Sequence, residues 1–241
     1  MIFLFLFFLG LICWFISTVA AGGAATILIP IIAFLLGVQM VAPIISVAAL
    51  ITNPTRAYVF RKSIDWNVIL YLLPGSIIGA IFGAWSFAQT DARIIQIILG
   101  LFLICYALKA KLIKAKNLIK MKLSWFFPLG LTVSFLSGLV GATGPIHNPF
   151  MLDYGITKEC LIGTKAVNSL IMQVTKLISY GFFGVFTIQI GVYGIALGCG
   201  AIIGVFLARN HLQNISPTRF KQYSLAIMFF CGVIMLIKAF M

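Results

Sequence analysis

The chain has 241 residues, of which 62% are hydrophobic and only 9% are charged, and its mean hydropathy is +1.15. This apolar share excludes an ordinary water-soluble domain and predicts an all-α polytopic membrane protein. Seventeen Lys and Arg against four Asp and Glu give a formal charge of +13, and in a membrane protein such an excess orients loops and contacts anionic lipid, so the bilayer is the expected partner and nucleic acid is not.

Apolar runs divide the first half of the chain into candidate membrane segments. A helix that crosses the hydrocarbon core needs about 20 residues. The long apolar runs, which are candidates for such helices, are Met1–Ala20, Met40–Phe60, Val68–Phe87 and Ile94–Leu108. Ala24–Leu36 has only 13 residues, so it is predicted to be a half helix or a re-entrant helix.

The second half repeats this plan. Its segments are Trp125–Val140, the short Pro145–Tyr154, Cys160–Phe183, Ile188–Ala208 and Phe220–Ala239. Hydrophobic peaks alone predict about eight spans for the whole chain.

A lysine-rich connector separates the two halves. It carries Lys109, Lys111, Lys114, Lys116, Lys120 and Lys122. We interpret it as a cytoplasmic anchor, with regulation by lipid as the alternative. The sequence therefore predicts three parts: a first transmembrane repeat at 1–108, the connector at 109–123 and a second repeat at 124–241.

Each half contains one stretch that breaks helices. Ser137–Pro149 holds three glycines and two prolines, and 21–30 is a fainter copy in which Gly22 corresponds to Gly141 and Pro30 to Pro149. Unpaired backbone groups cost several kcal/mol in lipid, so such a stretch survives only where protein or a wet cavity covers it. Interrupted segments at corresponding places of two repeats are typical of a transporter's binding site.

The distribution of basic residues favours one topology. If each broken stretch crosses the membrane once, the halves are parallel and several basic loops lie outside. If each stretch enters and returns, the halves have inverted topology, and nearly all the basic loops lie inside. The positive-inside rule therefore favours two duplicated halves of inverted topology, each with a glycine-broken, re-entrant helix.

Polar residues follow a helical period in two of the long segments. Lys165, Asn168 and Lys176 share one face of Cys160–Phe183, and Asn53 and Arg56 share one face of Met40–Phe60. Cations inside a membrane normally face a bundle interior or a cavity. The alternative for all three cations is that their side chains extend toward the membrane surface.

The broken stretches add backbone donors to this candidate site. Helices that begin at the breaks direct unpaired N–H groups and a positive dipole end toward them, which predicts an anion pocket without a bound metal. The candidate substrate-binding residues contributed by the breaks are Gly22, Gly23, Thr26, Gly141, Thr143, Gly144, His147 and Asn148. His147 could pass a proton and couple transport to it, or it could be a hydrogen-bonded structural histidine.

Missing residue types narrow the function further. The four acids, Asp65, Asp91, Asp153 and Glu159, all lie in or beside predicted connections, so the segments lack the buried carboxylates that cation carriers commonly use, and a small anionic substrate is expected. The chain has no nucleotide-binding loop and no catalytic motif, so neither a cofactor nor an enzyme activity is expected. The five cysteines stand singly, without a metal-site spacing.

The glycine breaks resemble those of a known family. The order of Gly22-Gly23 to Pro30, the stretch Ser46–Arg61, Trp66, the glycine-spaced segment 75–83, and Gly138-x-x-Gly141 to Pro149 is similar to the sulfite exporter TauE/SafE family of bacterial and archaeal permeases. The resemblance runs nearly from end to end. It implies a multi-pass protein of the cell inner membrane that exports sulfite or organosulfonates such as sulfoacetate.

We therefore predict a secondary transporter of small anions, in which two halves rock around the broken helices. The alternatives are a membrane scaffold or assembly factor that transports nothing, and a carrier of another small solute. A homo-oligomer is compatible with each of them.

Overall fold

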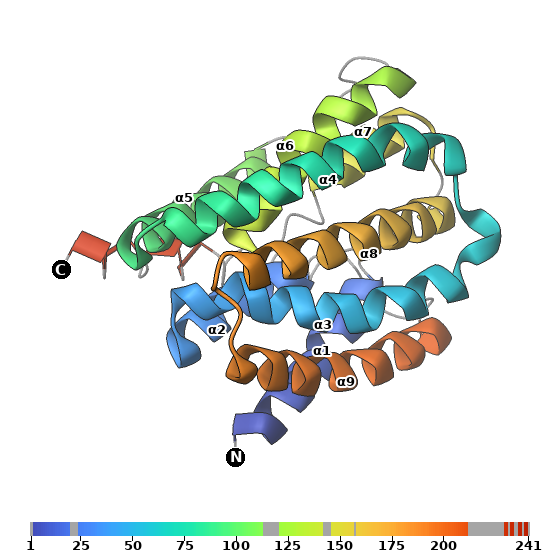
Figure 1. Ribbon diagram of the computed structural model, residues 1–241. Helices are drawn as coiled ribbons and strands as arrows, with labels where there is room; N and C mark the ends of the chain where they lie inside the picture. The colour runs from blue at the N-terminus through green and yellow to red at the C-terminus, as the bar shows by residue number, and fades with distance from the viewer. Residues whose placement is uncertain are drawn as a thin grey trace.

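The computed structural model describes residues 2–19, 24–112, 121–141, 146–156 and 158–211, and eight further residues at 229–230, 232–233, 236–237 and 239–240. Throughout these ranges the regular structure is helical, as predicted, and no strand is present in them (Figure 1). The predicted segment Phe220–Ala239 and the centre of the lysine-rich connector lie mainly outside the described residues.

The helices follow the predicted segments closely. They are α1 (Ile2–Val19), α2 (Ala24–Leu36), α3 (Val38–Val59), α4 (Trp66–Gln89), α5 (Ala92–Leu112), α6 (Phe126–Val140), α7 (His147–Asp153), α8 (Lys158–Phe182) and α9 (Ile188–His211), with short 3-10 turns η1 (Arg61–Ser63) and η2 (Leu123–Trp125). The predicted start of the short seventh helix at Pro145 lies outside the described residues, and α7 begins at His147.

The expected number of about eight spans is not reached within the described ranges. There, four segments are long and apolar enough to cross a membrane, namely Val38–Val59, Trp66–Gln89, Leu123–Val140 and Ile188–Ala208. The apolar parts of α1, α2 and α5 are shorter. Helix α8 has 25 residues, but Lys158, Lys165 and Lys176 interrupt its apolar sequence.

Close helix pairs are formed across the two halves of the sequence. Helix α1 packs along α9 and α4 packs along α6, whereas α3 contacts both α8 and α9. Glycines permit this approach, because a Cβ atom on Gly75 would lie 2.1 Å from the carbonyl oxygen of Phe127, and one on Gly200 would lie 1.8 Å from that of Phe7. The glycine-spaced segment 75–83 of α4 is therefore a helix contact in which backbones approach closely.

The second broken stretch turns back on itself. The ring of Phe126, at the start of α6, lies 5.2 Å from the ring of Tyr154, just after α7. Met151 of α7 also belongs to the same buried cluster as Val68 and Leu72 of α4. The start of α6 and the end of α7 therefore lie at the same end of the bundle.

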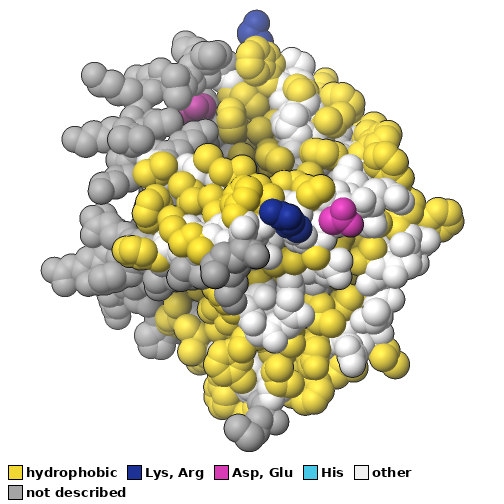
Figure 2. All heavy atoms as spheres, turned by 90° about the vertical axis from the view of Figure 1, so that its left-hand side faces the viewer, with side chains coloured by type: hydrophobic (Ala, Val, Ile, Leu, Met, Phe, Trp, Pro, Cys, Tyr) yellow, Lys and Arg dark blue, Asp and Glu magenta, His cyan; other side chains and the backbone are white. Residues whose placement is uncertain are grey.

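That end is also the basic one. Arg61 and Lys62 are exposed in the connection between α3 and α4, on the right of Figure 1. Gly163, near the start of α8, lies beside Phe60, so the sequence around Lys158 is at this end too. Figure 2 looks onto the opposite end, where the described side chains are largely hydrophobic and few are charged.

Candidate functional site

Helix α8 carries the polar face on which the candidate site is built. Lys165 and Lys176 are eleven residues apart on it, which places them on nearly the same side and about 16 Å apart along the axis. Asn168 and Met172 lie between them and are both buried. The helical spacing predicted from the sequence is therefore present, and it faces the interior of the bundle.

The first cluster surrounds Lys165. The Lys165 ammonium donates a hydrogen bond to Oδ1 of Asn148 on α7, and it interacts electrostatically with His147 and with Arg56 of α3. His147 is only 6% exposed, and its Nε2 has no hydrogen-bond partner among the described residues. Three helices thus bring polar or cationic side chains together at the start of α7.

Arg56 connects this cluster to the end of α1. Its Nη2 donates hydrogen bonds to Oγ of Ser17, at 3.2 Å, and to Oγ1 of Thr18, at 3.0 Å. The Nε of Arg56 is buried, and it has no partner in the part of the chain that the structure describes. Sequence reasoning missed both hydroxyls, although they are the last polar side chains before the break that contains Gly22.

Lys176 lies in a second place, against the end of α6. It is fully buried, and its Nζ donates to Oγ of Ser137 at 3.3 Å and to the carbonyl oxygen of Gly141 at 3.4 Å. One turn later, the Tyr180 hydroxyl donates to the carbonyl oxygen of Gly138. Carbonyls at the end of a helix have no partner within the helix, so these two side chains cap α6.

Two further predicted residues have a clear structural setting. Gly141 has a φ of 93°, and a Cβ atom there would lie 2.9 Å from Cα of Ala42, so a side chain would be both strained and crowded. Asn53 donates from Nδ2 to Oγ of Ser169 at 2.8 Å, which joins α3 to α8. These two positions shape the site more than they present charge to it.

Some predicted residues are not placed. Thr26 lies in the first turn of α2, and its side chain is outside the description. Outside the described residues altogether are Gly22, Gly23, Thr143 and Gly144.

The acidic side chains are exposed or serve as a helix cap. Asp65 caps α4 by accepting a hydrogen bond from the backbone N–H of Val68 at 3.2 Å, and Asp91, Asp153 and Glu159 are exposed. The hydrogen bonds described above for Arg56 and Lys176 all end on uncharged oxygens. Across the described ranges, no cluster of His, Cys, Asp and Glu could hold a metal ion.

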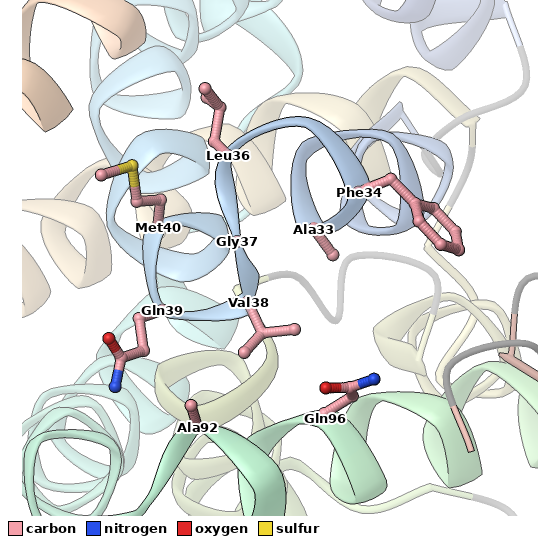
Figure 3. A pocket seen from close by; sticks show the side chains of 9 residues that line it. All are labelled: Ala33, Phe34, Leu36, Gly37, Val38, Gln39, Met40, Ala92 and Gln96. Carbon is pink, nitrogen blue, oxygen red and sulfur yellow. The ribbon is translucent and has the colours of Figure 1, made fainter. Parts of the chain in front are cut away.

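A pocket of about 380 Å³ opens near the end that is opposite the basic loops. It lies between the turn from α2 to α3 and the start of α5 (Figure 3). Gly37, with a φ of 96°, makes this turn. Val38 and Gln96 face each other across the pocket, while Phe34 points away from it. Gln39 and Gln96 are its polar lining side chains, so it offers amides and no charge.

Comparison with known families decides the identity of the chain. The family model described as sulfite exporter TauE/SafE matches residues 6–235, which is nearly the whole sequence. The chain belongs to the sulfite exporter TauE/SafE family. Membership supports a membrane transporter of sulfur anions, and it agrees with the resemblance found in the glycine breaks. Searches of curated proteins and of solved structures gave no match to this TauE/SafE chain.

Proposed function

We propose that this TauE/SafE chain is a secondary transporter of small anions in the cell inner membrane, with sulfite or an organosulfonate as its substrate. The observation that carries the proposal is the cluster of Lys165, Asn148, His147 and Arg56 inside the bundle, in which the hydrogen bonds described for the two cations end on uncharged oxygens. A desolvated cation attracts an oxyanion far more strongly than an exposed one does. Amide and hydroxyl groups add directional donors.

Substrate would bind at the start of α7. Lys165 supplies a point charge, and Arg56 supplies the buried Nε donor that has no partner among the described residues. The hydroxyls of Ser17 and Thr18 hold the guanidinium in place. A sulfite or sulfonate group presents several oxygens, so it can accept from both cations together.

We further propose alternating access between two inverted, duplicated halves. Two kinds of contact support the duplication. A Cβ on Gly10 would lie 2.0 Å from the carbonyl oxygen of Leu197, and one on Gly130 would lie 2.3 Å from that of Leu72. Gly130 comes 120 positions after Gly10, and Leu197 comes 125 positions after Leu72. In the first contact the glycine belongs to the first half and the leucine to the second, and in the second contact this assignment is reversed.

Two cations, one on α3 and one on α8, follow the same relationship. Arg56 bonds to Ser17 and Lys176 bonds to Ser137, and both members of the second pair come 120 positions after those of the first. Inverted repeats of this kind carry binding sites at broken helices in other transporters. The basic end of the bundle would face the cytoplasm.

Cysteine labelling tests the inverted arrangement. In a variant whose native cysteines are replaced by alanine, single cysteines would be introduced as Gln39→Cys, Ser124→Cys and Asp153→Cys, all at exposed positions. A membrane-impermeant maleimide added to intact cells should label position 39 and leave 124 and 153 unlabelled until the cells are opened. External labelling at 153 with protection at 124 would instead indicate that the second broken stretch crosses the membrane once.

Flux through proteoliposomes tests the transport function. We expect saturable uptake of labelled sulfite or sulfoacetate, competition by the other, and little competition by an amino acid. Repeating the assay with and without a pH gradient shows whether proton movement drives the flux. If folded protein moves none of these anions, the carrier proposal is wrong, and a scaffold function becomes the explanation to pursue.

A further inference from the structure

We propose that Lys176 marks a second anion-binding position, separate from the cluster around Lys165, so that an oxyanion passes through the protein in two steps. The inference rests on the proposed carrier function and extends it from one position to two. The ligand would be a small inorganic oxyanion such as sulfite.

Separation along α8 is the first argument. Lys165 and Lys176 are eleven residues apart, or about 16 Å along the axis. The two ammonium groups also have different partners, because Lys165 bonds to Asn148 of α7 and Lys176 bonds to Ser137 and Gly141 at the end of α6. Each cation therefore has surroundings of its own and can serve a binding position of its own.

The surroundings of Lys176 are the second argument. The side chain is 0% exposed, and its two hydrogen bonds, at 3.3 and 3.4 Å, are long and end on uncharged oxygens. Bonds from an ammonium to an anion are usually about 2.7–2.9 Å. An ammonium has three N–H donors. The two hydrogen bonds use two of them, and the third has no partner within the described ranges. A buried cation held this weakly is costly, and a bound anion would remove the cost.

The path between the positions is the third argument. Asn168 is 3% exposed, and its Oδ1 has no partner among the described residues. An amide in this state can turn its NH₂ group toward a passing anion. Met172, which is buried, and the hydrogen bond from Asn53 to Ser169 lie at the level between the two lysines. A rearrangement at this level would connect the two positions.

Binding stoichiometry tests the proposal. Equilibrium dialysis of full-length purified protein against labelled sulfite should show two ions bound per chain, and one ion for Lys176→Gln with the affinity of the other position unchanged. Lys176→Arg keeps the charge and should bind two. Lys62→Gln, at an exposed position, is the matched control and should also bind two.

A second variant keeps the test decisive if Lys176→Gln does not fold. Ser137→Ala removes one acceptor that competes for the Lys176 ammonium, so the second ion should bind about tenfold more tightly. If Lys176 only caps α6, the wild-type protein will bind a single ion that Lys165→Gln removes, and Ser137→Ala will leave its affinity unchanged. That result overturns the second position and leaves the carrier function standing. A wild-type protein that binds and moves no anion refutes the carrier function itself.

Discussion

Replacing Lys165 by glutamine should lower the initial rate of sulfite uptake by about 100-fold or more. The side chain lies inside the bundle, bonds to Asn148 and shares a cluster with Arg56. Under the proposed function the Lys165 ammonium pairs with the bound anion, and truncating one partner of a desolvated charge pair commonly costs about 2–5 kcal/mol, which is a factor of about 30 to several thousand. The rate is measured in proteoliposomes that contain equal amounts of folded protein.

Two further variants show whether the loss of uptake is caused by the missing charge at Lys165. Lys62→Gln removes a positive charge from an exposed loop at the basic end and should leave the rate unchanged. Lys165→Arg keeps the charge with a different shape and should retain part of the activity, because a guanidinium and an ammonium place their donors differently. Equal rates for wild type, Lys165→Gln and Lys62→Gln would remove Lys165 from the site.

The second large effect is expected at a glycine in a helix contact. A Cβ atom on Gly200 would lie 1.8 Å from the carbonyl oxygen of Phe7, so Gly200→Ala must separate α9 from α1. Backbone cannot move aside as a side chain does, and the cost should reach or exceed the usual upper range for overpacking, about 3 kcal/mol. For a chain of this size the melting temperature should fall by about 10 °C, as measured by thermal unfolding in detergent.

Gly181→Ala is the matched control for this substitution. Gly181 is also helical, but a Cβ atom there would have no atom within 4 Å. Alanine is favoured over glycine in a helix by up to about 1 kcal/mol, so this variant should melt at the same temperature as wild type or slightly higher. If both variants melt together, the close contact between α1 and α9 is wrong.

The first and last residues of the helices could be predicted from the sequence, because they depend on the hydrophobicity of neighbouring residues and on the positions of glycines. The limits of α2, from Ala24 to Leu36, agree with the predicted segment. The glycine spacing of 75–83 in α4 is also visible in the sequence, and the structure assigns α6 as its partner. The count of about eight spans stays a prediction, because four segments within the described ranges are long and apolar enough to cross a membrane and the apolar parts of α1 and α5 are shorter.

The site was harder to predict because it depends on contacts between distant residues. The stripe on α8 could be read from its period, but nothing in the sequence links Arg56 to Ser17 and Thr18. Nor does spacing show that Lys176 caps α6 while Lys165 bonds to α7. The pocket beside Gly37 was missed for the same reason, since Gln39 and Gln96 come from separate helices.

The pairing of α1 with α9 and of α4 with α6 determines which helices can move together as units. Each pair joins one helix from the first half of the sequence to one from the second, and their backbones touch at glycines. For the proposed transport cycle we therefore expect helices of both halves to move together, in contrast to the rocking of one half against the other that the sequence suggested. A chain divided within the connector would give two fragments that each lack a partner for their closest contacts, so neither fragment should fold alone, and activity should return only when both are made in the same membrane.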